Sequence, residues 1–172
     1  PAEVDLDAVT VYRGDYRGLT SIRLASAYPI IEGYKDFPAY GVRLNFPDPC
    51  WLHGLTLAYS YTPNDPLPED ERSHVRARYR HGRWTLDAAV NRADFYDLFG
   101  PTKSSRKGYS LAGSFRHSFV DDPPNALSLG ASLAKYGDLQ RMPDAQNVAT
   151  SYDHFYTGSA DLVFSRLDGT LG

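Results

Sequence analysis

Three residues near the end of the chain, Ser151, Asp153 and His154, are of the types that make a hydrolase triad. In a triad the nucleophile must lie within hydrogen-bond reach of its base. The surrounding pattern predicts a strand, on which Asp153 and His154 would point to opposite faces. The sequence therefore predicts no catalytic residue and no enzymatic activity.

The side chains that commonly bind metals are scattered along the chain. Its five histidines show no ligand spacing such as His-x-x-x-His: His53, His74, His81, His117 and His154. The single cysteine, Cys50, can form no intrachain disulfide, and its neighbours Pro49 and Trp51 favour a thiol packed in a turn. Glycine-rich phosphate loops and nucleotide fingerprints are missing from the sequence. No metal site and no cofactor are predicted.

Charged residues are the strongest candidates for a functional arrangement. The net charge is −3 and the Lys and Arg residues are interspersed with acids, so nucleic acid is not expected as a partner. Several arginines nevertheless fall close together, and unpaired charge is costly to bury in a dry core, which favours a wetted interior. We expect a charge network that lines a lumen and consists of Arg76, Arg78, Asp87 and Arg116.

Strands are the elements that must position these charges. In Leu55–Tyr61 large apolar side chains occupy the odd positions and small or polar ones the even positions, which is the period of a strand with unlike faces. The alternation recurs near 42–46, 74–80, 83–91, 109–116 and 127–133, with a weaker first strand near 19–28 and a long last one near 148–165. We expect an all-β fold, an antiparallel up-and-down meander of about eight strands. No segment has a convincing helical period.

The connections between these strands alternate in length. Long ones are expected near 29–39, 62–72, 93–107 and 137–147, and short ones near 47–53, 81–82, 119–125 and 166–169. Successive turns of a meander fall on opposite rims, so the long loops would gather at one rim, as in outer-membrane barrels. Strands of about 8 to 11 residues also suit a tilted span of a bilayer. The meander is therefore predicted to be part of a transmembrane β-barrel.

One long loop and one tight turn carry further expectations. The loop at 93–107 is too rich in aromatic residues to be freely solvated, so we expect contacts with the rim, the lumen or a partner from Phe95, Tyr96 and Phe99. A two-residue turn at His81-Gly82 would place Arg76 opposite Asp87 on the polar face. The same register would place Tyr79 opposite Trp84 on the apolar face, where a membrane-interface girdle would lie.

Short stretches of the chain resemble a known barrel. Tyr16-Arg17-Gly18-Leu19, Pro29, Gly41 and Asp48-Pro49-Cys50-Trp51-Leu52-His53 resemble the opening of the C-terminal, surface-antigen-type barrel of bacterial proteins with an N-terminal TolB-like β-propeller. The resemblance implies the outer membrane of a Gram-negative bacterium, contact with its lipid bilayer, envelope proteins as partners, and a structural, transport or envelope-assembly role. It offers no catalytic residue.

We expect the chain to be an excerpt of a longer protein. Residues 1–16 would be a linker or the exit from an absent upstream domain, and residues 17–172 a partial β-barrel truncated at its C-terminus. The chain has no initiator methionine and no secretory signal at Pro1. It stops at Thr170-Leu171-Gly172, which resembles the start of a strand.

A soluble β-barrel or sandwich that binds a small apolar ligand is the alternative, because its strands alternate in the same way. The polar face carries Ser, Thr, Gly, Ala and paired charges rather than long Lys and Glu side chains, which favours the membrane barrel. The two hypotheses differ in whether the apolar face points outward or inward. The residues that decide between them are Leu55, Leu57, Tyr59, Trp84 and Leu86.

Overall fold

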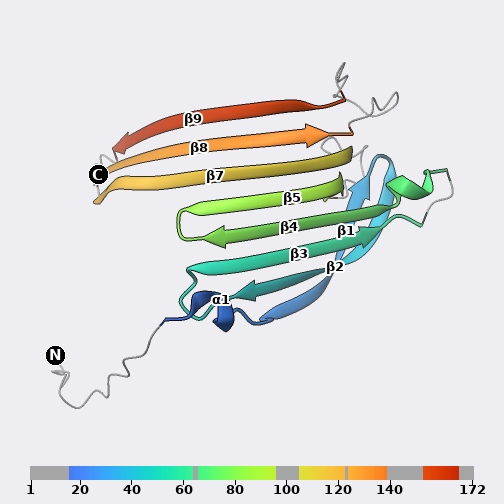
Figure 1. The fold of residues 1–172 in the computed structure, drawn as a ribbon, viewed down its shortest axis with the longest axis horizontal. Helices are drawn as coiled ribbons and strands as arrows, with labels where there is room; N and C mark the ends of the chain where they lie inside the picture. The colour runs from blue at the N-terminus through green and yellow to red at the C-terminus, as the bar shows by residue number, and fades with distance from the viewer. Residues whose placement is uncertain (1–15, 64–65, 96–104, 123, 139–152, 167–172) are drawn as a thin grey trace, which may run out of the picture.

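A single antiparallel sheet makes up most of the described part of the protein (Figure 1). The computed structural model describes residues 16–63, 66–95, 105–122, 124–138 and 153–166. The strands are β1 (Ser26–Tyr34), β2 (Phe37–Pro47), β3 (His53–Tyr61), β4 (Ser73–His81), β5 (Trp84–Arg92), β6 (Asp94–Phe95), β7 (Arg106–Asp122), β8 (Asn125–Gly137) and β9 (Phe155–Arg166). Their order is β6-β1-β2-β3-β4-β5-β7-β8-β9, which confirms the all-β antiparallel meander. The sheet is not closed: within the described residues β9 pairs only with β8.

In the described residues two short helical turns accompany the strands, α1 (Gly18–Ser21) and the 3-10 turn η2 (Glu69–Glu71). The prediction of a strand near 19–28 is wrong, since α1 occupies its first part and β1 begins at Ser26. The hydroxyls of Thr20 and Ser21 each donate to the carbonyl of Arg17 at 3.0 Å, and such local bonds compete with strand pairing. No helix in the described ranges is long and apolar enough to cross a membrane.

The predicted connections 47–53 and 62–72 are confirmed, the first long one is wrong, and 166–169 lies largely outside the described residues. Long connections follow β3, β6 and β8, whereas the segment 29–39 forms strand and a tight turn, because Tyr34 pairs with Phe37. Pro29 is tolerated in β1 because β6 pairs with β1 only at Glu32 and Gly33, so β1 is an edge strand at Pro29 within the described residues. The predicted connection 119–125 is also shortened, since β7 and β8 extend to Asp122 and Asn125.

The hairpin between β4 and β5 differs from the predicted register. His81 pairs with Trp84, so Gly82 and Arg83 form the turn, and Gly82 takes a positive φ of 53°. The partner of each residue is therefore displaced by two from the prediction based on His81-Gly82. Glycine adopts a positive φ more readily than histidine, which favours glycine at the first turn position. A displacement of two leaves every side chain on the predicted face.

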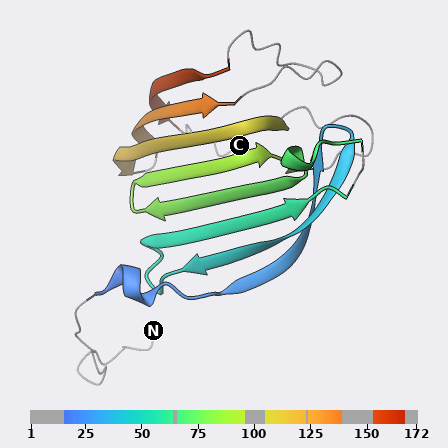
Figure 2. The ribbon, with the colours of Figure 1, turned by 45° about the vertical axis from the view of Figure 1, so that its right-hand side comes forward.

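Contacts between distant strands show how the sheet curves. The rings of Tyr34 on β1 and His74 on β4 are 4.5 Å apart, although three strand spacings in a flat sheet measure about 14 Å. Ser60 on β3 donates a hydrogen bond of 2.7 Å to Glu32 on β1, across the intervening strand β2. β6 follows β5 directly and pairs with β1, so the first five strands curl toward one another at the long-loop rim (Figures 1 and 2).

The face that carries these contacts is therefore the concave face. By the register it includes Glu32, Ser60, His74, Arg76, Arg78 and Asp87. The opposite, convex face is apolar and largely uncovered: Leu86 is 54% exposed, Leu133 63% and Leu162 67%. The other exposed apolar side chains of the convex face include Val42, Tyr59, Val75, Trp84, Val90, Leu111 and Phe164. In the described part of the chain the buried apolar cluster is small, with Tyr34, Leu67 and Ala93 at its centre.

Candidate functional site

A three-residue charge network lies on the concave face. Asp87 Oδ2 accepts a hydrogen bond of 2.9 Å from Arg78 Nε, which lies directly opposite in the register. The same oxygen accepts bonds of 3.3 and 3.2 Å from Nε and Nη2 of Arg76, its diagonal neighbour. The predicted contact between Arg76 and Asp87 is present, although Arg76 is paired with Ala89 rather than with Asp87. One carboxylate between two guanidinium groups leaves an excess positive charge.

Arg116, the fourth predicted member, shares the face but not the network. It pairs with Gly130 on β8, while Ala112 is the residue of β7 opposite Asp87. Four residues of strand separate these positions, about 13 Å at the usual rise. The backbone N–H of Arg116 donates to the carbonyl of Arg83 at 3.0 Å, which places Arg116 near the short-turn rim.

A row of polar side chains continues the network across the sheet. Asn45 Nδ2 donates to Ser26 Oγ at 2.9 Å, and Thr56 Oγ1 donates to Asn45 Oδ1 at 3.1 Å. The register aligns Ser26, Asn45, Thr56, Arg78 and Asp87 along five adjacent strands. Sequence reasoning missed the first three, because their meeting depends on the registers of separate strand pairs. The row borders a groove of about 350 Å³ on the concave face.

A buried ionic cluster ties together the long-loop rim. Glu71 of η2 is 3% exposed, accepts a hydrogen bond of 3.0 Å from the Tyr34 hydroxyl and lies 2.7 Å from Lys35 Nζ. Lys107 Nζ of β7 lies 3.3 Å from Glu71 and 2.7 Å from Asp70. Burial alone would raise the pKa of Glu71, but the hydrogen bonds from Lys35, Tyr34 and Lys107 hold it below its usual range. The cluster joins η2 to the β1–β2 turn and to the start of β7.

His74 and Asn91 form a second buried group beside this cluster. His74 is 3% exposed, with Nε2 2.9 Å from Thr62 Oγ1 and Nδ1 2.7 Å from the carbonyl of Asn91. Asn91 has a positive φ of 46°, and its amide nitrogen donates to the carbonyls of Asp70 and Ser73 at 2.6 and 3.2 Å. Both ring nitrogens of His74 are occupied, so it acts as a structural residue.

Two of the stretches quoted for the family resemblance, 16–19 and 48–53, meet at the short-turn rim. Asp48, 2% exposed, accepts hydrogen bonds from the backbone N–H groups of Leu52 and His53 at 3.1 and 3.0 Å and from the hydroxyl of Tyr16. Burial would raise the pKa of Asp48, but these hydrogen bonds lower it, while burial and the neighbouring carboxylate raise the pKa of Tyr16 to about 12. A side chain at Gly18 would overlap the ring of His53, so α1 packs closely on the turn.

The remaining candidates form no common site. Phe95 lies on β6 opposite Glu32 and is 81% exposed, while Tyr96, Phe99 and Ser151 lie outside the described residues. Asp153 and His154 are exposed and precede β9 rather than lie within it. Cys50 is exposed, which corrects the expectation of a packed thiol: the side chain of Asp48 fixes the turn from within and leaves Cys50 outside.

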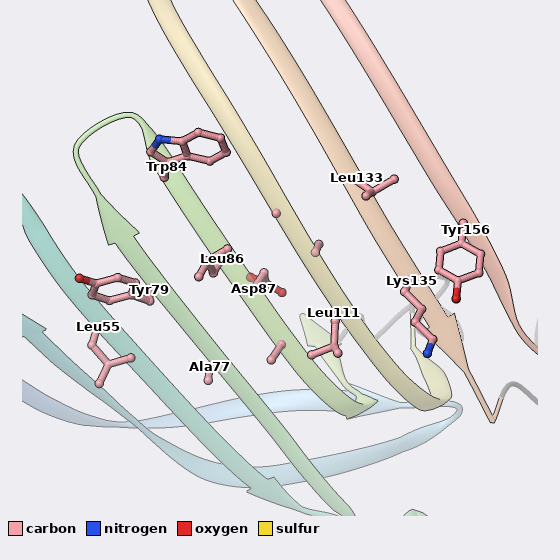
Figure 3. Close-up of a pocket in the computed structure, with 13 residues that line it drawn as sticks. Leu55, Ala77, Tyr79, Trp84, Leu86, Asp87, Leu111, Leu133, Lys135 and Tyr156 are labelled. Carbon is pink, nitrogen blue, oxygen red and sulfur yellow. The ribbon is translucent and has the colours of Figure 1, made fainter.

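The convex face carries a shallow apolar groove of about 680 Å³ (Figure 3). Its lining side chains come from β3, β4, β5, β7, β8 and β9 and include Leu55, Tyr79, Trp84, Leu86, Leu111 and Leu133. The only cation among the lining residues is Lys135, whose Nζ lies 5.9 Å from the ring centres of both Tyr109 and Tyr156. Comparison with protein families, with curated proteins and with solved structures gives no match to this chain.

Proposed function

We propose that this chain is a segment of a transmembrane β-barrel in a bacterial outer membrane, with lipid against its convex face and a polar lumen along its concave face. The proposal rests mainly on the direction in which the sheet curves. In water, a curved sheet with two unlike faces would enclose its apolar side chains. Here the charged face is concave and the apolar face is convex and uncovered, as in membrane barrels.

Aromatic side chains at both ends of the apolar face support this proposal. The rings of Trp84 and Phe115 lie 4.8 Å apart near the short-turn rim. Toward the long-loop rim Tyr40 pairs with Tyr61, and Lys135 lies beside Tyr109 and Tyr156. Aromatic rings and long cationic side chains are favoured at the level of lipid headgroups, because each has an apolar body and a polar tip.

We further propose that the barrel belongs to the surface-antigen-type barrels of TolB-like propeller proteins. The pattern behind that resemblance has a physical basis here, since Tyr16 binds Asp48 and Gly18 packs on His53. The role would be structural, in transport or in envelope assembly, with outer-membrane lipid and envelope proteins as partners. No catalysis is proposed.

Membrane contact can be tested by placing one charge on either face of β5. Leu86→Arg in the intact protein should lower the free energy of unfolding in lipid vesicles by about 2 to 4 kcal/mol, because the charge would enter the bilayer. Thr85→Arg is the matched control, since its side chain lies on the concave face. Equal stability of the two variants in a urea titration would contradict the proposal.

The alternative, a soluble barrel or sandwich that binds an apolar ligand, would use the groove on the convex face (Figure 3). That function needs the apolar face to line the interior of the barrel. The contacts between Tyr34 and His74 and between Ser60 and Glu32 lie on the opposite, concave face, so the curvature supports the membrane proposal.

A further inference from the structure

A second groove, on the concave face near the short-turn rim, has the features of a ligand site. Its volume is about 350 Å³, at the lower end of the range of small-molecule sites. Side chains from β1 to β4 and from the β2–β3 turn line it, because the sheet curls around it. The polar lining residues are Ser26, Asn45, Thr56, Arg78 and Arg80, and the aromatic ones are Phe46 and Trp51.

The groove has an excess of positive charge. Arg80 has no hydrogen-bonded or ion-paired partner among the described residues, and its Nη2 lies 3.8 Å from the position of a Cβ at Gly54. Arg78 shares the single carboxylate of Asp87 with Arg76. No acidic residue is among those that line the groove.

Nearby carboxylates are already bound elsewhere. Asp87 is held by its two arginines, and Asp48 by the backbone N–H groups of Leu52 and His53 together with the Tyr16 hydroxyl. Neither carboxylate is therefore free to neutralise Arg80.

Neutral hydrogen-bond donors complete the lining. Ser26 Oγ accepts a bond from Asn45, so the hydroxyl hydrogen of Ser26 remains available. Arginine offers a planar fork of N–H groups that matches the oxygens of a phosphate or carboxylate. Further along the same face Arg43 has a buried Nε without a hydrogen-bond partner among the described residues, and its charge adds to the positive field.

We propose that this groove binds an oxyanion, the phosphate or carboxylate group of a small water-soluble solute. Arg80 and Arg78 would hold the charge, while Ser26 would donate to an anion oxygen and Trp51 would form part of the wall. This assignment deepens the proposed function, because it names an anionic class of solute for the proposed lumen.

Calorimetric titration of the intact protein in dodecyl maltoside micelles, with inorganic phosphate and with citrate at constant ionic strength, tests the assignment. Arg80→Gln should weaken binding about tenfold, which corresponds to one lost charge-assisted hydrogen bond. Arg83→Gln is the matched control, because Arg83 is exposed in the adjacent turn and is not among the lining residues. Gly54→Val, which fills the groove without a change of charge, should weaken binding as well.

Three outcomes would overturn the assignment. They are no saturable binding by the folded protein, equal losses for Arg80→Gln and Arg83→Gln, and binding only in micelles that contain phosphatidylglycerol, which would assign the anion to a lipid headgroup. A protein that folds in micelles but binds no anion would leave the membrane proposal standing. A protein that folds and binds phosphate in water without detergent would overturn the membrane proposal and support the assignment of an oxyanion site to the groove.

Discussion

At the scale of single residues, several polar groups of the concave face bind one another. Asp87 serves two arginines, and the amide of Asn45 links Ser26 to Thr56. The side chains of Arg76, Arg78 and Asp87 are 33%, 51% and 21% exposed, so solvent screens their attraction in part. Each ion pair is therefore expected to contribute modestly, and the network matters because it fixes the positions of the charges.

Removal of the shared carboxylate tests this network. Asp87→Ala should lower the free energy of unfolding by about 1 kcal/mol, because it leaves two like charges side by side. The loss should be smaller when Arg76→Ala is already present, so a double-mutant cycle measured by urea unfolding in detergent should show coupling. Thr85→Ala, on the same face of β5, is the control. Additive losses in the cycle would show that the three groups do not act together.

At the scale of elements, the tight curl of the first strands depends on a small residue in β2. Gly41 lies between Ile30 of β1 and Ser60 of β3. A Cβ at this position would lie 2.6 Å from Cβ of Ser60, well inside a normal contact distance. The curl that brings Glu32 to Ser60 therefore leaves no room for a side chain at Gly41.

Gly41→Ala should consequently destabilise the protein by about 1 to 3 kcal/mol, the usual cost of overpacking. Gly54→Ala, on the same face of β3, should have little effect, because the nearest atom would lie 3.8 Å from the new Cβ. Thermal or urea unfolding of both variants measures the difference. Equal stability of the two variants would mean that β2 and β3 leave room for a side chain at Gly41, contrary to these distances.

The faces of the strands could be predicted from the sequence, whereas their partners could not. Alternation with a period of two identifies the face of Leu86 or Arg76, and a register displaced by two residues leaves that prediction intact. Gly82 can occupy either the first or the second position of a two-residue turn, so the sequence does not fix the register of this hairpin. The predicted pairing of Arg76 with Asp87 is therefore wrong, although their side chains are in contact. Most of β1 lies in the predicted connection 29–39, because Pro29 and Gly33 are typical of loops, and an edge strand tolerates them.

The groove on the concave face could not be predicted from the sequence for a related reason. Ser26, Asn45 and Thr56 are ordinary strand residues in the sequence, and none belongs to a motif. They meet because three strand pairs have particular registers and because the sheet curls. In this row of residues the sequence singles out only Arg78 and Asp87, since a charge on a polar face needs a partner.

At the scale of the whole molecule, the distribution of polarity is inverted relative to a water-soluble barrel. The interior of the curl holds Glu32, His74 and Arg76, while large apolar side chains such as Leu133 and Leu162 remain uncovered. An exposed apolar surface that extends across most of the sheet needs a covering, and in the proposed barrel lipid would provide one. Within the described residues β9 pairs only with β8, so its other edge is available to a further strand.

Spin labels along β5 would show directly whether lipid contacts the convex face, as proposed. In the intact protein with Cys50→Ser, reconstituted in vesicles, single labels would replace Leu86 and Ala88 on the convex face or Thr85 and Ala89 on the concave face. Collisions with oxygen, which concentrates in lipid, should be frequent at 86 and 88 and rare at 85 and 89. The reverse alternation, or equal collision rates at all four positions, would contradict the account.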